Sequence, residues 1–280
     1  HVKTGRTHLM DAMPVTLGQT LTAWADQLAE ALVQLEQQLP ALQALGQGGT
    51  AVGTGVNGHP QFANEFCLSL SAVTGVEFAP TSNPFTRIGS QDVAVALSGA
   101  LKRSAVVISK VANDLRLMNS GPLSGLAEIE LEALQPGSSI MPGKVNPTQC
   151  EMLTMVAGQV IGNHQAVTVG GMQGHFELNV FMPLIGSNVI RSVELLAIGM
   201  EGFATRCVEG IEANEEQIAA LVERSLMLVT ALAPEIGYDN AAKIAKHAHQ
   251  TGQTLKQAGL ELGLVDEPTF DRLVRPADMV

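Results

Sequence analysis

The segment at residues 137–151 reads GSSIMPGKVNPTQCE and joins a long irregular loop to a predicted helix. The loop covers residues 119–147 and is interrupted by Gly-Pro and Pro-Gly pairs, which stop regular structure. In a compact domain an irregular segment of this length is typically a lid or a binding loop. Asn146 is predicted to cap the helix, with Pro147 at its first position and Gln149 as a capping-box partner. The segment therefore predicts a functional loop that ends at a helix N-terminus.

This helix start is suited to an anion. A helix N-terminus presents free backbone N–H groups and the positive end of the helix dipole, and Lys144 adds a full charge just before it. Ser138 and Ser139 place two hydroxyl groups on the preceding turn. The residues alone leave a second interpretation open, in which Asn146 and Pro147 only start a helix and the serines only shape a turn.

Several segments carry a resemblance to a known family. Residues 137–147 resemble the signature loop of the aspartase/fumarase superfamily, and the continuation through Glu151 resembles its class II fumarase form. Residues 5–12, which read GRTHLMDA, resemble the histidine motif of the family. Residues 48–55, GGTAVGTG, and residues 174–180, GHFELNV, also resemble the fumarase pattern. The resemblance implies an all-α fold, built as a bundle of long helices with a small helical C-terminal domain. It also implies a hydro-lyase that reversibly hydrates fumarate to L-malate, a step of the tricarboxylic acid cycle.

The signature loop contains residue types that this reaction needs. Removing a proton from a carbon next to a carboxylate creates a dianionic aci-carboxylate, which requires fixed positive charge and hydrogen-bond donors around it. Lys144, the amide of Asn146 and the N–H groups of the following helix are of the right kind. Ser138 is the candidate base, provided that backbone N–H groups and nearby cations stabilise its alkoxide. Ser139, Lys144 and Asn146 are the candidate substrate-binding residues of this loop.

The second half of the reaction moves water to or from the neighbouring carbon. An imidazole suits this task near neutral pH, and His8 stands where the family motif has its histidine. The resemblance implies that Glu151 pairs with His8 and tunes it, and that Thr7 contacts a substrate carboxylate. Without the resemblance, His8 would be an ordinary loop histidine and Glu151 a favourable acidic residue in the first turn of a helix.

The composition favours packed helices. Of the 280 residues, 46% are hydrophobic and only 4% are aromatic, so aliphatic side chains must fill the core. The formal net charge of -11 argues against nucleic acid or an anionic membrane as the main partner. We therefore expect a small-molecule partner, a dicarboxylate if the resemblance holds.

Apolar periodicity locates the long helices. A heptad pattern of leucines from Leu21 to Leu42 predicts a helix that Pro40 ends or kinks. Further helices are predicted at residues 62–73, 90–118, 148–169 and 183–210. Long helices with short connections between them favour a bundle.

Shorter helical segments begin after a predicted boundary near residue 212. We expect a central helical bundle over residues 1–212 and a small helical domain over residues 213–280. Asn214 is predicted to cap the first helix of the second part. Residues 1–17 are predicted to form a loop that leads into the bundle.

Two other features receive structural interpretations. The glycine-rich segment at residues 46–60 lacks the GK[ST] ending of a phosphate loop, so its glycines are predicted to let helices and backbone approach closely. His247 and His249 lie two residues apart and therefore on different faces of a helix. They are predicted to be surface histidines rather than a metal-binding pair.

The cysteines and the absence of targeting signals favour a cytoplasmic protein. The three cysteines form no CxxC pair and have no metal-ligand spacing, so reduced core thiols are expected. No signal peptide is recognised and no uncharged apolar run reaches bilayer length. The resemblance implies a reaction without a metal or an organic cofactor.

Two alternative functions remain open. An aspartate ammonia-lyase would have the same fold, but the resemblance implies Gln in such enzymes where His8 stands here. The other alternative is an inactive helical core that only oligomerises, because the first of the three motif regions of the family has no counterpart in this sequence. We therefore expect the later part of a longer enzyme, with an incomplete active site. The resemblance implies a homotetramer in which three subunits share each active site, and apolar stripes along several helices agree with such an assembly.

Overall fold

The computed structural model describes all 280 residues, which divide into two compact units. The smaller unit contains His1–Ala25, Leu117–Leu131 and Ile211–Val280, and the larger unit contains Asp26–Arg116 and Glu132–Gly210. Helices α1 (Leu17–Glu36) and α5 (Asp92–Met118) each contribute residues to both units. The boundary predicted near residue 212 remains a prediction.

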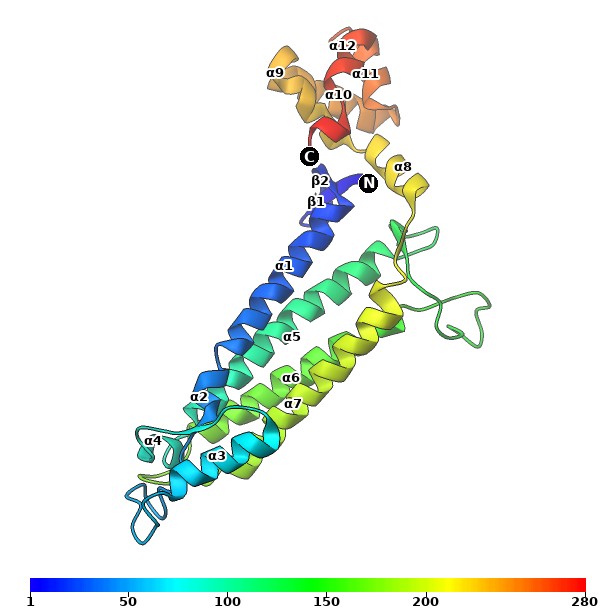
Figure 1. Ribbon diagram of the computed structural model, residues 1–280. Coiled ribbons are helices and arrows are strands. Elements are labelled where there is room, and N and C mark those ends of the chain that lie inside the picture. The colour runs from blue at the N-terminus through cyan, green and yellow to red at the C-terminus, as the bar shows by residue number, and fades with distance from the viewer. The chain divides into compact units, whose positions relative to one another are not determined.

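Long helices build the larger unit. Helices α5, α6 (Thr148–Gly171) and α7 (Met182–Phe203) run side by side with the later part of α1, as Figure 1 shows. The predicted helices at 90–118 and 148–169 are confirmed to within two residues, and the helical content confirms the all-α fold. The third helix ends earlier than predicted, because a π-helical turn, η1 (Ala204–Val208), follows Phe203.

One face of α6 supplies much of the core of this bundle. Its buried residues recur at three- and four-residue intervals: Cys150, Leu153, Ala157, Val160, Asn163, Val167 and Gly170. Asn163 donates from Nδ2 to the Ser192 hydroxyl of α7, with a distance of 3.1 Å. His164 Nδ1 lies 3.0 Å from the Ser98 hydroxyl of α5. These polar contacts fix the register of three otherwise apolar helices.

The helix predicted from the leucine pattern is divided near Pro40, as expected. Helix α1 ends at Glu36 and α2 (Leu39–Gln43) begins with Pro40 in its first turn, where its missing N–H has no cost. Helix α3 (Phe62–Thr74) then ends at Gly75, which adopts the left-handed conformation usual at a helix C-terminus. Short elements complete this end of the unit: β3 (Ala44–Leu45), β4 (Ala79–Pro80) and α4 (Phe85–Ile88).

The first residues form a β-hairpin, so the predicted loop over residues 1–17 is wrong. Strands β1 (Val2–Thr7) and β2 (Met10–Thr16) pair antiparallel, with His8 and Leu9 in the turn between them. Both turn residues have positive φ, 56° and 61°, as two-residue hairpin turns commonly require. The turn lacks the Asn-Gly or Asp-Gly sequence that usually reveals such a hairpin, which explains the error.

Short helices complete the smaller unit. They pack on an apolar cluster centred on Leu232, Ile244 and Ala258. Asn214 caps the first of them as predicted, since its Oδ1 accepts the Gln217 N–H at 3.2 Å. The elements of this part are α8 (Glu215–Glu223), η2 (Leu226–Leu232), α9 (Ala233–Ile236), α10 (Tyr238–Thr251), α11 (Leu255–Glu261), α12 (Glu267–Leu273) and η3 (Pro276–Asp278).

A short strand pair links two distant parts of the chain within this unit. Strand β5 (Ile129–Glu130) pairs antiparallel with β6 (Glu212–Ala213), directly before α8.

No single helix of the chain has the length and apolar composition needed to cross a membrane, although α8 and residues 226–236, bent by 60° at their junction, meet the requirement together.

Candidate active site

Ser138 lies on the signature loop with its hydroxyl oxygen turned toward the backbone that follows. Its Oγ accepts hydrogen bonds from the N–H groups of Ile140, at 3.3 Å, and Met141, at 3.2 Å. The residue itself is half-buried, so solvent still reaches the site. Two N–H donors directed at one oxygen favour its ionised form, which is the property that a serine base requires.

The loop is closed on itself by side-chain contacts. Asn146 donates from Nδ2 to the Gly137 carbonyl at 3.2 Å, and Lys144 donates from Nζ to Asn146 Oδ1 at 2.5 Å. Gly137 has no room for a side chain, because a Cβ there would collide with the Lys144 carbonyl oxygen. The structure thus gathers Ser138, Lys144 and Asn146 in one closed turn, and Ser139 is exposed on the same turn.

The predicted capping arrangement at the start of α6 is wrong. The helix begins at Thr148, as the predicted range has it, so Pro147 stands at the cap position rather than at the first helical position, and no side-chain capping bond is present. Asn146 cannot cap the helix, because its amide is already held by the Gly137 carbonyl and the Lys144 ammonium group. Gln149 consequently has no capping-box partner. The first turn of α6 therefore carries no side-chain cap, and its acidic residue is Glu151, whose charge suits the helix dipole.

Thr7 and His8 belong to the smaller unit. Both are exposed, Thr7 at the end of β1 and His8 in the hairpin turn. Glu151 belongs to the larger unit, in the first turn of α6. The pairing of His8 with Glu151 therefore remains a prediction.

Sequence reasoning missed a buried carboxylate in the smaller unit. Glu128 is fully buried, and its oxygens lie 3.2 Å from Lys3 Nζ and 2.9 Å from Arg6 Nη1. Its partners lie more than 120 positions earlier in the chain, so no local pattern could have revealed the contacts. Residues 126–132 read LAEIELE, so Glu128 is one of three alternating glutamates and nothing local distinguishes it.

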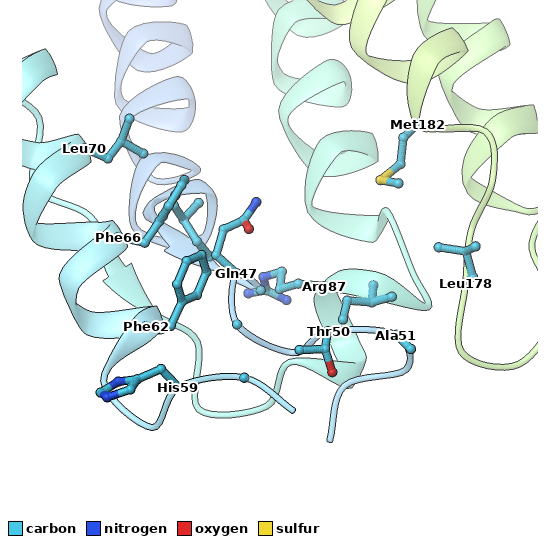
Figure 2. Close-up of a pocket in the computed structure, with 15 residues that line it drawn as sticks. Gln47, Thr50, Ala51, His59, Phe62, Phe66, Leu70, Arg87, Leu178 and Met182 are labelled. Carbon is cyan, nitrogen blue, oxygen red and sulfur yellow. The ribbon is translucent and has the colours of Figure 1, made fainter. Parts of the chain in front are cut away.

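The glycine-rich segment lines an open cavity of about 750 Å³ in the larger unit. Figure 2 shows Phe62, Phe66 and Leu70 of α3 on one side of it, and Leu178 and Met182 on the other. Its arginine, Arg87, donates from Nε to the Ala44 carbonyl at 3.2 Å. The lining of the cavity is therefore mainly apolar, and the Arg87 guanidinium group already has a backbone partner.

The close-packing interpretation of these glycines is confirmed. A Cβ at Gly49 would lie 2.8 Å from Ile88 Cδ1 and 2.9 Å from Pro84 Cβ. At Gly53, whose φ is +116°, a Cβ would lie 2.8 Å from the Phe85 ring. Any side chain here would push the loop away from α4.

All three cysteines are buried and unbridged. Cys150 Sγ lies 3.9 Å from Cys207 Sγ, and their hydrogen bond holds the pKa of the Cys207 thiol below its usual value while it raises the pKa of Cys150. Burial raises the pKa of Cys67.

No group of three or more His, Cys, Asp or Glu side chains in the chain could hold a metal ion. His249 is exposed as predicted, whereas His247 is half-buried, with its Nε2 3.3 Å from Glu261 Oε2.

Comparisons with protein families find two matches. Residues 1–162 match a family described as "Lyase", and residues 228–280 match one described as "Fumarase C C-terminus".

Curated relatives are similar over essentially the whole chain. The "Fumarate hydratase class II" of Methylorubrum extorquens is 53% identical over 100% of this chain and 59% of its own length. The "Fumarate hydratase, mitochondrial" of Danio rerio is 53% identical over 100% of this chain and 55% of its own length. The chain thus spans less than two thirds of the length of these relatives.

Two solved structures share the fold. The class II fumarase from Schistosoma mansoni has a TM-score of 0.95 and 42% identity, with 99% of this chain and 61% of that chain covered. The fumarate lyase:delta crystallin from Brucella melitensis bound to cobalt has a TM-score of 0.93 and 45% identity, with 99% and 60% covered.

Proposed function

Because the chain belongs to the lyase family and is a homologue of the class II fumarases, we propose that it carries residues with which a hydro-lyase interconverts fumarate and L-malate. The observation that supports this most directly is the Ser138 hydroxyl, whose oxygen accepts two backbone N–H groups. The relatives are longer than this chain, so the activity of the whole protein is part of the proposal.

In the direction from malate, the Ser138 alkoxide takes a proton from the carbon next to one carboxylate. The electron pair left behind moves into that carboxylate and forms the dianionic aci-carboxylate. Lys144 provides the positive charge that stabilises this species, and Asn146 holds the Lys144 ammonium group in place through its Oδ1. Such a base in the correct position contributes about 10²- to 10⁴-fold to the rate.

The intermediate then loses its hydroxyl group from the neighbouring carbon. His8 donates a proton to the departing oxygen, so that water leaves and fumarate remains. Glu151 supports the protonated imidazole, while Thr7 and Ser139 bind substrate carboxylate. We propose that these residues meet in a homotetramer, in which subunits share each active site.

The test is the ultraviolet absorbance of the unsaturated product, measured with the natural gene product that contains this sequence. L-Malate should give fumarate, and Ser138→Ala should lower kcat by at least about 10²-fold. Ser124→Ala is the matched control, because Ser124 is exposed in the segment before the signature loop and should leave kcat unchanged.

Two outcomes would contradict the proposal. Product from L-aspartate but not from L-malate would identify an ammonia-lyase instead. Full malate activity in Ser138→Ala would remove Ser138 from the mechanism.

A cytoplasmic location remains a prediction, since proteins named mitochondrial are among the relatives.

A further inference from the structure

We propose that Glu128 is a positioning residue, which sets the orientation of the Thr7–His8 turn through its ion pairs with Lys3 and Arg6. The inference rests on the proposed function, since it assigns to this turn the role of presenting Thr7 and His8 to substrate. It concerns residues of the smaller unit only.

Three charged side chains are buried at one place. Glu128 is 0% exposed, Lys3 is 6% exposed, and the Arg6 side chain is 15% exposed. Taking ions out of water costs several kcal/mol per ion, and the attraction between them often only offsets this cost. A buried ion cluster is therefore weak support for stability, and a geometric role accounts better for its presence.

The cluster also contacts the strand that ends in the turn. Lys3 Nζ donates to the Thr4 carbonyl at 2.8 Å, and Arg6 Nη1 donates to the same carbonyl at 3.3 Å. The pairing of β1 with β2 shifts register between Thr4 and Arg6. A shift of this kind redirects the side chains that follow it, and here Thr7 and His8 follow immediately.

The backbone of Glu128 itself is held in place. Its N–H donates to the Met118 carbonyl at 2.8 Å, and its carbonyl accepts from the Asn214 N–H at 3.0 Å. The next residue, Ile129, pairs with Ala213 in the β5–β6 ladder. The carboxylate therefore projects from a segment that is held on both sides, and it transmits that fixed position to β1.

The discriminating variants are Glu128→Gln and Glu128→Asp. Glutamine keeps the shape of the side chain but removes its charge, so Arg6 and Lys3 face each other without the carboxylate between them. We expect kcat for L-malate to fall about 10²-fold, because small displacements of a catalytic group have effects of this size. KM should rise as well, because Thr7 on the same turn binds substrate carboxylate in the proposed function. Glu128→Asp keeps the charge on a shorter side chain and should recover part of the lost kcat.

Glu130→Gln is the matched control, since Glu130 is exposed and lies two residues away on β5. It should leave kcat, KM and the midpoint of thermal unfolding unchanged. A folded Glu128→Gln protein with the kcat of the unchanged protein would overturn the proposal. If Glu128→Gln does not fold, Glu128→Asp carries the test, and wild-type kcat in that folded variant would overturn it equally.

A second readout separates this inference from the proposed function. The backbone amide and imidazole resonances of His8 report the geometry of the turn whether or not the protein converts malate. Positioning by Glu128 predicts that these resonances shift in Glu128→Gln and stay in place in Glu130→Gln. Unshifted His8 resonances would overturn the inference, whereas shifted resonances in a protein inactive on malate would contradict only the proposed function.

Discussion

Gly137 shows how closely the signature loop folds on itself. Its backbone approaches the Lys144 carbonyl so nearly that no side chain fits, and its own carbonyl accepts the Asn146 amide. These contacts place the lysine of the site with respect to Ser138. The position therefore tolerates only glycine while the loop keeps this shape.

We predict that Gly137→Ala opens the loop and lowers kcat. The new Cβ would collide with the Lys144 carbonyl and lie 2.9 Å from Val145 Cα, so the bond from Asn146 to residue 137 should break. A loss of about 10²-fold in kcat is expected, with little change in the thermal midpoint because most of the loop is exposed. Steady-state kinetics on L-malate and thermal unfolding measure the two effects.

Gly18→Ala is the control for this substitution. Gly18 is exposed in the first turn of α1, and a Cβ there would meet only Thr16 Oγ1 at 3.8 Å, so alanine should leave kcat and the thermal midpoint nearly unchanged. Equal kinetics for Gly137→Ala and the unchanged protein would show that the closed loop is not needed.

Prediction from sequence anticipated one local feature, the N–H groups around the Ser138 oxygen, and failed where contacts are long-range, while the roles that the resemblance gave to single residues remain predictions. The requirement that N–H groups surround the Ser138 oxygen was derived from its chemistry, and the structure contains two such groups. The helix-cap role predicted for Asn146 is wrong, because its side-chain amide bonds to Gly137 and Lys144 and not to the first turn of α6, whereas its substrate-binding role remains a prediction. Glu128 was missed since Arg6 is 122 positions away in sequence.

At the scale of elements, the contact between α5 and α6 contains a titratable side chain. His164 of α6 is half-buried against Ser98 of α5, and burial together with the positive charge of Lys102 lowers its pKa. The folded protein therefore binds a proton at this site less readily than the unfolded chain does. Stability must fall as the pH drops from the ordinary histidine pKa of about 6.5 toward the lower folded value.

We predict that His164→Gln makes the stability less dependent on pH. Glutamine can still bond to Ser98 but does not titrate, so the fall in unfolding free energy between about pH 7.5 and 5 should be smaller than in the unchanged protein. Urea denaturation at a series of pH values measures this. His249→Gln, at an exposed position of α10, is the control and should keep the original slope. Identical slopes for the two variants would contradict the assignment.

Long helices were predictable because their periodic apolar faces extend over many residues. The predicted ranges for α5 and α6 agree with the structure closely. The β1–β2 hairpin could not be predicted in this way. Its strands are shorter than the helices, and its turn residues, His8 and Leu9, adopt positive φ without a glycine or asparagine. Local sequence gave no reason to expect that conformation.

At the scale of the whole molecule, the bundle helices keep large apolar side chains on their outer faces. Met155 of α6 is 68% exposed, and Ile190 and Ile198 of α7 are 61% and 72% exposed. Exposed apolar side chains on two packed helices agree with surface that a protein interface covers. The predicted homotetramer would cover such surface, and this assembly was inferred from the resemblance because apolar stripes do not define a number of subunits.

We predict that the protein in solution has about four times the mass of the 29.4 kDa chain, or of the gene product that contains it. Ile198→Glu should lower the assembled fraction, because it would bury a charge in the interface. Light scattering after size exclusion measures both masses. Tyr238→Glu, at an 80% exposed position of α10, is the control and should leave the assembly intact. A monomeric unchanged protein would contradict the prediction.

The ring that Asn146 closes onto Gly137 also has a thermodynamic consequence. Residues 137–146 lose much of their conformational entropy when the chain folds, since a side-chain bond spans them before any ligand arrives. A dicarboxylate that binds at Ser138 and Lys144 therefore need not order this loop, and less of its interaction free energy is lost to ordering. For the proposed substrate site, much of the cost of ordering this turn would in that sense already be met by the folding of the protein.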